Sequence, residues 1–373
     1  MLGAMTRRIA PFALLGLLAL SACGGGSAAA PASSNAGTGA PAQTGAPSTP
    51  EQLAAYQGSD RQQVLEAGAK KEGTLTWYTS LAGPIIDSLA AGFKAKYPYL
   101  KVDIFRGDES VLMTRALQEA QAGKPVFDTI EVTPTTSRLL AEAKLLAPYS
   151  SPTAAKLPEV LKTPGANGLT VNASDRISYI GFGYNTKLIP ADAVPKKTDD
   201  LMNPALAGKL TLAGSTTGNR WAASVLHLMG DDKGRKWLAD FAAKQKPTVQ
   251  QVSGKAVLDL IAKGELPASP TIFLDHVEQA KATGQPVEWV PLEPVVGNAG
   301  QVSFDIKAPH PNAGLLYVDY LLGDGQEVLR QNSYFPATEK VPFNVWIPET
   351  GRTAAQVEQD AKDWADLFKA DFR

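Results

Sequence analysis

The sequence has few of the residues on which disulfide, metal and catalytic sites depend. It has one cysteine, Cys23, and three histidines in 373 residues. A single cysteine excludes an internal disulfide. The histidines His227, His276 and His310 are scattered along the chain, so we expect no shared histidine metal site. The motifs G-x-S-x-G and H-E-x-x-H are also absent, and the sequence therefore favours a non-catalytic protein.

The sequence also lacks an excess of charge of either sign. Lys and Arg number 36, Asp and Glu number 37, and the formal net charge is -1. Without a basic excess, nucleic acid is not an expected partner. The hydrophobic content of 44% is ordinary for a globular protein. The roughly 320 residues after residue 50 are too many for one ordinary core and predict two lobes.

No apolar run is long enough to cross a membrane. The longest, residues 11–20 (PFALLGLLAL), follows Arg7 and Arg8 and precedes a few small residues. It is about half of the roughly 20 residues that a spanning helix needs. A basic start, a short apolar run and a small-residue exit are typical of a secretory signal, which we assign to residues 1–23.

The single cysteine and the stretch after it predict a tether. The run LSAC at residues 20–23 resembles the bacterial lipobox, in which the cysteine becomes the lipidated first residue of the mature protein. The alternative is an ordinary signal peptide with an incidental cysteine. Residues 24–50 contain no charge and no large apolar side chain, so we expect a flexible linker with a span of about 30 Å. These features predict an exported protein, lipid-anchored through Cys23 to a membrane of the cell envelope.

The body of the chain alternates between strand and helix patterns. Period-2 or β-rich segments predict strands at 73–79, 101–105, 127–132, 209–212, 248–252, 268–273 and 287–290. Helical spacing predicts helices at 84–97, 109–122, 136–147, 219–229, 255–263, 275–282, 312–322, 326–331 and an amphipathic C-terminal helix that includes 357–368. Strands that alternate with helices predict parallel sheets with right-handed crossovers.

Two further segments read as extended chain: 176–185 lies between the two series, and 295–306 follows the second series. The simplest arrangement is two α/β lobes joined by two crossings, at about 177–184 and 291–300. Two lobes with a double connection form a cleft that can close on a ligand. The alternative is two α/β domains in series without a chain return. The predicted boundaries are 51–176 plus 292–335 for lobe 1 and 177–291 plus 336–373 for lobe 2.

Six short motifs occur in the order and spacing of a known family. They are LTWYTS (75–80), FDTIE (127–131), GFGYNT (181–186), NPALAGKL (203–210), EWVP (288–291) and APHPNA (308–313). Through them the chain resembles the type 2 periplasmic-binding-protein fold, and more narrowly the extracellular solute-binding proteins of the ferric-iron-binding group. No motif is specific alone, and their order over about residues 73–340 carries the resemblance.

The resemblance implies a two-lobe (Venus-flytrap) α/β fold, each lobe a mixed, mostly parallel sheet flanked by helices. It also implies a monomer without a cofactor or enzymatic activity, which delivers a small solute to the membrane permease of an ABC importer. Service to a membrane receptor as a sensing partner is a further possibility that the sequence does not separate from transport. An exported enzyme on a related fold is another alternative, for which we find no nucleophile and base.

The family's iron site does not carry over to this sequence. Its adjacent tyrosines would fall near residues 272–275, where there is no tyrosine, and its first-lobe His and Glu ligands would fall near Ala82 and Thr133. Ferric iron needs several oxygen donors, often anionic. We therefore expect no bare metal site. The alternative is ferric iron bound as a chelate or through a rearranged oxygen site.

Candidate ligand contacts lie in loops that follow strands, because the cleft of an α/β protein is lined by the carboxyl ends of its strands. Loops that open helices also present N–H groups that favour anions. Hence we predict a small, polar, anionic organic solute, such as a phosphonate, a phosphorylated sugar or a carboxylate. For each position the alternative is a helix cap, a solvated arginine or core packing. The predicted contacts are Thr79, Ser80, Arg106, Thr133, Thr135, Ser215, Thr216, Thr217, Gly218, Arg220, Thr271 and Asp275.

Overall fold

The computed structural model describes residues 47–81 and 83–372. The predictions of a signal segment, a flexible linker and a lipidated Cys23 fall outside the described residues, apart from the last residues of the linker range. Within the described part of the chain, every helix is too short or too polar to span a bilayer.

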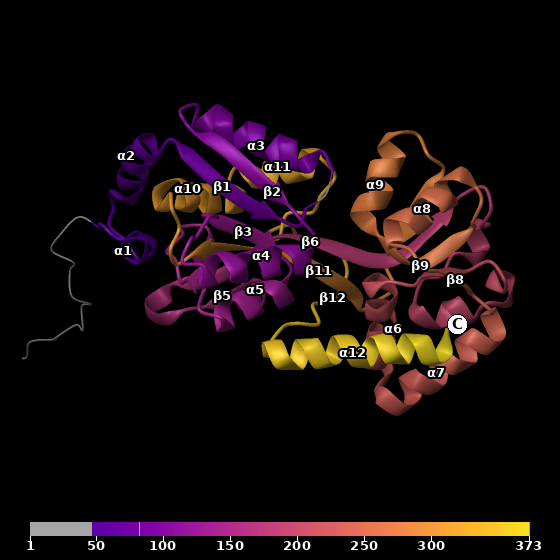
Figure 1. Cartoon of the computed structure of the whole chain (residues 1–373). Helices are drawn as coiled ribbons and strands as arrows, with labels where there is room; N and C mark the ends of the chain where they lie inside the picture. Colours follow the sequence, from indigo (N-terminus) through magenta and orange to yellow (C-terminus); the bar gives the residue numbers. More distant parts are fainter. Residues whose placement is uncertain (1–46, 82, 373) are drawn as a thin grey trace, which may run out of the picture. The chain divides into compact units, whose positions relative to one another are not determined.

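Helices and strands alternate along most of the chain, as the sequence patterns predict (Figure 1). The helices are α1 (Pro50–Ala54), α2 (Arg61–Glu72), α3 (Ile85–Lys96), α4 (Glu109–Gln121), α5 (Pro134–Glu142), α6 (Thr216–Met229), α7 (Asp231–Gln245), α8 (Gly254–Lys263), α9 (Leu274–Ala282), α10 (Pro311–Leu322), α11 (Gly325–Gln331) and α12 (Ala354–Asp371). The strands are β1 (Thr74–Thr79), β2 (Lys101–Arg106), β3 (Thr129–Val132), β4 (Leu146–Ala147), β5 (Lys162–Pro164), β6 (Thr170–Asn185), β7 (Thr211–Ala213), β8 (Thr248–Gln250), β9 (Ala268–Phe273), β10 (Val287–Val290), β11 (Val295–Asp305) and β12 (Val345–Trp346).

The helix expected at 136–147 is wrong at both ends. It begins earlier, at Pro134, and ends at Glu142. Lys144 adopts a left-handed backbone conformation with φ 60°, which ends the helix. The next residues, Leu146–Ala147, form β4 and pair with β11. The apolar residues that looked like a continuing helical stripe therefore belong to a short strand.

The main sheet is mixed, with strands in the order β10-β6-β11-β3-β1-β2. β1 pairs in parallel with β2 on one side and β3 on the other, so Thr79 lies opposite both Arg106 and Glu131. β11 joins β3 antiparallel, and β6 joins β11 antiparallel. β9 and β10 also pair antiparallel with β6, while β7 and β8 form a separate parallel pair.

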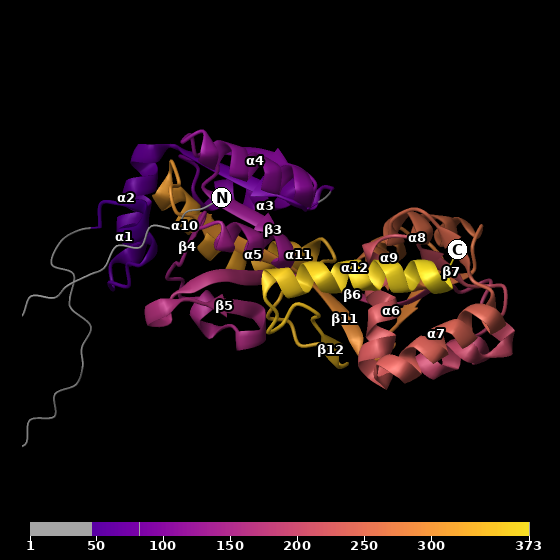
Figure 2. The same ribbon diagram turned by 60° about the horizontal axis from the view of Figure 1, so that its bottom comes forward.

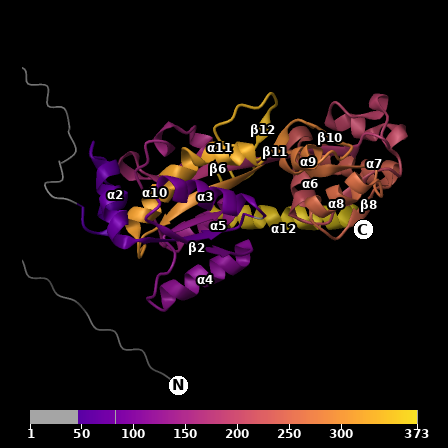
Figure 3. The same cartoon turned by 90° about the horizontal axis from the view of Figure 1, so that it is seen from above.

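β6 and β11 connect two separately packed groups of elements (Figure 1, Figure 3). One core centres on Trp77, Phe93 and Tyr317, where α3 and α10 cover β1. Another centres on residues such as Trp221 and Phe241, which α6 and α7 contribute. β6 pairs with β5 near its start and with β9 and β10 near its end. The two long strands are thus shared by both groups, whereas the exact lobe boundaries stay a prediction.

α12 lies along the second group and reaches the first. It contacts α6 and α7 and, near its start, α5 (Figure 2). Phe368 and Leu367 bury their side chains in the core that contains Trp221. The amphipathic pattern of the C-terminal segment, with a Thr353 cap, explains this placement. One face of α12 therefore borders the space between the starts of α5 and α6.

Gly300 of β11 is needed because a buried ionic group occupies the space beside it. β6 bulges opposite this glycine, and a β-carbon added there would lie 2.6 Å from Glu131 Oε1 and 2.8 Å from Asp175 Oδ1. We expect Gly300→Ala to lower the free energy of unfolding by about 2–3 kcal/mol in urea titrations, because packed cores resist added volume. The control is Gly107→Ala, whose added carbon would meet Leu112 at 3.3 Å, for which we expect a loss of less than about 1 kcal/mol. Equal losses would contradict this account of Gly300.

Candidate functional site

A pocket of about 350 Å³ lies where the starts of α5 and α6 face α12. Five of the residues that the sequence predicts as ligand contacts line it: Thr133, Thr135, Thr216, Thr217 and Arg220. They come from two loops that are distant in sequence, one after β3 and one after β7. The structure thus brings together the predicted contacts of two separate strand ends.

Both helices point their amino ends at this pocket. Thr133 is the N-cap of α5 and Ser215 is the N-cap of α6, and neither side chain makes a capping hydrogen bond. The Ser215 hydroxyl is buried and has no hydrogen-bond partner among the described residues. The first N–H groups of a helix have no acceptor within the helix, and the helix dipole makes this end partly positive. The pocket therefore offers N–H groups and partial positive charge from two sides.

Arg220 supplies the pocket's full positive charge. One nitrogen of its guanidinium, Nη2, donates to Oε1 of Glu349. The side chains are 12% and 2% exposed, respectively. Its other terminal nitrogen, Nη1, is buried and lacks a partner among the described residues, as does Glu349 Oε2. Glu349 thus fixes the guanidinium while leaving an N–H donor for another acceptor, and a charged donor makes one of the stronger kinds of hydrogen bond.

Glu109 and Asn298 add polar groups that differ from the arginine. The Glu109 carboxylate accepts from the Thr133 backbone N–H at 3.1 Å and from the Thr133 hydroxyl at 3.0 Å. These bonds hold the loop after β3 in place. Asn298 lies on β11, and its side chain lines the same pocket. The lining is therefore of mixed character, able to meet an anionic group beside Arg220 and hydroxyl groups elsewhere.

The remaining wall is apolar. α12 contributes Val357, Ala361 and Trp364, and Phe273 lies at the end of β9. The Trp364 ring stands 6.1 Å from the ring of Trp346, measured between centroids. Flat apolar surface of this kind packs against a hydrocarbon chain or the face of a sugar ring.

Several pocket residues escaped the sequence prediction of ligand contacts. The predicted contacts do not include Glu109, Asn298, Glu349 or Trp364, all of which line the pocket. Trp364 carried a signal, since it belongs to the amphipathic stripe of the C-terminal helix. Glu349 carried none, because it lies in an irregular segment between β12 and α12.

Three predicted contacts on the first strands lie outside the lining of this pocket. The Thr79 side chain is fully buried, and its hydroxyl donates to Glu131 Oε2 at 2.7 Å. Ser80 donates its backbone N–H to the Glu131 carbonyl at 3.0 Å. Arg106 is exposed, pairs with Asp108 at 3.1 Å and donates to the Leu81 carbonyl.

Four predicted contacts in the second series also lie outside the lining. The Thr271 hydroxyl is buried and accepts from the Ala213 backbone N–H at 3.0 Å. Asp275 is buried, with Oδ2 3.7 Å from His276 Nε2. Gly218 packs so closely that an added β-carbon would lie 2.1 Å from the Ala213 carbonyl oxygen. Ser215 lies next to the pocket residue Thr216 without lining the pocket itself.

A buried ionic cluster lies where β3 and β6 meet β11. It consists of Glu131, Asp175, Arg176 and Asp275, all buried. Arg176 Nη2 donates to Glu131 Oε1 at 2.9 Å. Burial raises the pKa of Glu131, and the Arg176 guanidinium opposes this shift. Burial and the charge of Glu131 raise the pKa of Asp175. Arg176 therefore pairs directly with Glu131, and the charges of Asp175 and Asp275 also act on it.

The described part of the chain has few side chains placed to bind a metal ion. No three His, Cys, Asp or Glu side chains there are grouped closely enough to hold a metal ion. At the positions that correspond to the family's iron ligands, Thr133 instead binds Glu109, and residues 272–275 contain the buried Asp275.

The chain is similar to a known protein family in sequence and to known structures in fold. A family model described as "Bacterial extracellular solute-binding protein" matches residues 130–372. No curated protein matches the sequence. Among solved structures, iron-bound HitA from Pseudomonas aeruginosa is 19% identical, with a TM-score of 0.63 over 80% of this chain and 98% of that chain.

Two other solved structures extend the comparison. The periplasmic binding protein AfuA from Actinobacillus pleuropneumoniae, with fructose-6-phosphate bound, is 22% identical, with a TM-score of 0.61 over 80% of this chain and 99% of that one. IdiA (FutA) of Trichodesmium, in complex with iron and citrate, is 17% identical, with a TM-score of 0.62 over 80% and 99%. The predicted type 2 periplasmic-binding fold is confirmed.

Proposed function

This chain belongs to the bacterial extracellular solute-binding proteins, a non-enzymatic family, and from that premise we propose that it captures a small organic anion in the pocket between α5, α6 and α12. As a member of this family it is the solute-binding component of an ABC importer, working outside the cytoplasmic membrane. The loaded form presents its solute to the membrane permease. The proposal adds the chemical class of the solute and the residues that hold it.

The observation that carries the proposal is the free edge of Arg220. Arg220 lines the pocket, and its Nη1 is buried without a partner among the described residues, while Glu349 accepts from Nη2. A buried donor that lacks an acceptor costs about 1–3 kcal/mol, more for a charged group. An anionic oxygen would satisfy it, and the first-turn N–H groups of α5 and α6 would add further donors. Thr133, Thr135, Thr216 and Thr217 supply hydroxyls around the same point.

The other walls favour an organic anion over a bare ion. A solute whose anionic group meets Arg220 can place hydroxyls near Glu109 and Asn298 and an apolar face against Trp364. A phosphorylated sugar or a hydroxycarboxylate has all three features. AfuA, a structural neighbour, was solved with fructose-6-phosphate. That ligand is therefore the first probe to use here.

The proposal keeps the two lobes at 51–176 plus 292–335 and 177–291 plus 336–373. Closure of these lobes on the solute would bury Arg220 and the threonines further. It also keeps Cys23 as the lipid attachment site and residues 24–50 as the tether. A lipid at this position would hold the protein close to the permease.

A thermal-shift titration of the purified protein tests the function. The probes are fructose 6-phosphate, citrate and methylphosphonate, with neutral fructose as the matched control. At 100 times its dissociation constant a bound ligand stabilises the folded state by about 2.7 kcal/mol. We expect at least one anion to raise Tm and fructose to leave it unchanged. If none of the three anions raises Tm, the proposal is overturned.

Ferric iron held as a chelate is the alternative function. HitA was solved with iron and IdiA (FutA) with iron and citrate. In this chain such a chelate would bind through its carboxylates, beside Arg220. A visible charge-transfer band on addition of ferric citrate, together with a thermal shift that iron-free citrate does not give, would favour this alternative.

A further inference from the structure

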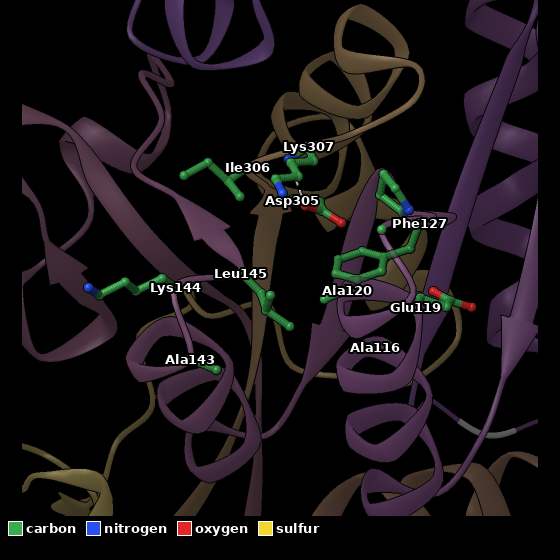
Figure 4. A pocket seen from close by; sticks show the side chains of 12 residues that line it. Ala116, Glu119, Ala120, Phe127, Ala143, Lys144, Leu145, Asp305, Ile306 and Lys307 are labelled. Atoms are coloured by element: carbon green, nitrogen blue, oxygen red, sulfur yellow. Dashed lines mark hydrogen bonds between the residues drawn. The ribbon is translucent and has the colours of Figure 1, made fainter.

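A second pocket, separate from the one at α5 and α6, lies within the first group of elements (Figure 4). It has a volume of about 230 Å³ and shares no lining residue with the first pocket. This volume is far larger than the roughly 10–15 Å³ that one water molecule needs, so the pocket has room for a small ligand. Its walls come from α4, the end of β11 and the turn between α5 and β4.

Small apolar side chains leave this space open. Ala116 and Ala120 stand one turn apart on α4 and are too small to fill the gap, and the Phe127 ring forms part of the wall. Figure 4 shows Phe127 with Asp305 and Glu119 on one side of the pocket, and Leu145 on the other. The walls thus suit the methylene chain of a small ligand.

Two carboxyl groups give the pocket a negative inner end. Asp305 is 5% exposed, and its Oδ1 accepts from the Lys307 backbone N–H at 2.8 Å. Its Oδ2 has no hydrogen-bond partner among the described residues. Glu119 Oε1 accepts from the Tyr78 hydroxyl and from Arg115 Nε, both at 2.7 Å. Glu119 Oε2 is buried and has no partner among the described residues. Each carboxyl group therefore keeps one acceptor oxygen for a donor that the described residues do not supply.

The outer rim of the same pocket is positive. Lys144 and Lys307 line it, and both residues are exposed. Neither lysine forms an ion pair within the described part of the chain. A cation inside and an anion at the rim would match this distribution of charge. The attraction is stronger for the cation beside the buried Asp305 than for the anion beside the exposed lysines, because water weakens electrostatic attraction.

We propose that this pocket binds a small zwitterion, with an ammonium group between Asp305 and Glu119 and a carboxylate at the lysine rim. The ammonium supplies the donors that Asp305 Oδ2 and Glu119 Oε2 lack, through charge-assisted hydrogen bonds. The methylene chain lies against Ala120 and Phe127. This site is separate from the anion site, so the protein binds a second solute independently of the first.

The pH dependence of binding follows from the charge of Asp305. Burial, helped by the nearby charges of Asp128 and Glu119, raises the pKa of Asp305 to about 7, although the backbone N–H and the charge of Lys307 oppose this shift. Lys144 also lines the pocket, and Arg115 pairs with Glu119 at 2.7 Å. Below pH 7 the carboxyl group becomes protonated and no longer attracts the ammonium, so the zwitterion should bind more tightly at pH 8 than at pH 5.5.

Isothermal titration at pH 8 with 4-aminobutanoate tests the proposal, with butanoate and butylammonium as matched probes. We expect the zwitterion to bind the most tightly and butanoate not to bind. Asp305→Asn keeps an acceptor for the Lys307 N–H and should weaken binding at least tenfold. Ala120→Leu fills the pocket without changing its charges and should abolish binding. Arg235→Met, on the exposed face of α7 and outside both pockets, should leave it unchanged.

Three results would overturn the proposal. The first is no binding of 4-aminobutanoate to the wild-type protein. The second is unchanged affinity in both Asp305→Asn and Ala120→Leu, with circular dichroism showing that both are folded. The third is competition between 4-aminobutanoate and an anion that binds at Arg220, which would move the zwitterion to the first pocket.

Discussion

Replacing Arg220 by methionine should weaken the binding of an organic anion about a hundredfold or more. A hydrogen bond to a charged group contributes about 1.5–3 kcal/mol. Two such bonds, one from each N–H of Arg220 Nη1, amount to at least about two powers of ten in affinity. Methionine keeps much of the aliphatic stem of arginine, so the change removes the guanidinium with little loss of packing. Isothermal titration with the anion that gives the largest thermal shift measures the effect.

The same substitution should also destabilise the protein, because Glu349 is 2% exposed and loses its partner. Breaking a buried ion pair on one side costs about 3–5 kcal/mol. The double variant Arg220→Met/Glu349→Leu removes both charges and should recover most of this stability without recovering affinity. Arg235→Met, on the exposed face of α7 and paired with Asp231, is the control and should change neither quantity. Restored binding in the double variant would contradict the role of Arg220.

The second large effect is expected at the buried ionic cluster. Arg176→Met leaves Glu131, Asp175 and Asp275 without their cation in a buried site. We expect the free energy of unfolding at pH 8 to fall by about 3–5 kcal/mol, the usual cost of an uncompensated buried charge. Chemical denaturation at several pH values measures the effect. Arg330→Met, an exposed arginine paired with Glu327, should cost no more than about 1 kcal/mol.

The loss in Arg176→Met should shrink as the pH falls. Burial already raises the pKa of Glu131 and of Asp175, and removal of the guanidinium raises both further. A carboxyl group with a raised folded-state pKa contributes stability below its unfolded-state pKa and loses it as the pH rises through the folded-state pKa. The variant therefore suffers most at pH 8 and least near pH 4. A deficit that is the same at both values would show that lost packing, and not charge, causes it.

Much of the fold follows from local patterns in the sequence. The expected strands at 268–273 and 287–290 are β9 and β10, because their β-rich segments are short and bounded by turn residues. Helices α2 and α7 have no counterpart in the prediction. α2 buries only Arg61, Leu65 and Ala69 and so carries little apolar periodicity. α7 does space Trp237 and Phe241 one turn apart, but its glycine and its many charges mask the pattern.

The sequence predicts a residue of the binding site only where the residue lies in a loop between a strand and a helix. Thr133 and Thr216 lie at strand ends that open helices, and this position alone suggests a cleft. The direction of a side chain at such an end is not set locally: Thr79 and Thr271 turn inward and bond to Glu131 and to the Ala213 N–H. Tertiary pairing decides these cases, and no local pattern reports it.

Glu349 illustrates the same limit more sharply. Its partner Arg220 lies 129 residues away in the sequence, and its own segment has neither helical nor strand periodicity. Only the path of the chain from β12 to α12 brings the carboxylate beside the guanidinium. A contact between two irregular or distant segments is therefore the part of a binding site that a single sequence reveals least.

A crystal structure of the protein with its co-purified or titrated solute tests the central claim most directly. We expect an anionic group within hydrogen-bond distance of Arg220 Nη1 and of the first-turn N–H groups of α5 and α6, with the rest of the molecule against Trp364. A bare metal ion, a cationic solute or a solute bound without contact to Arg220 would contradict the account.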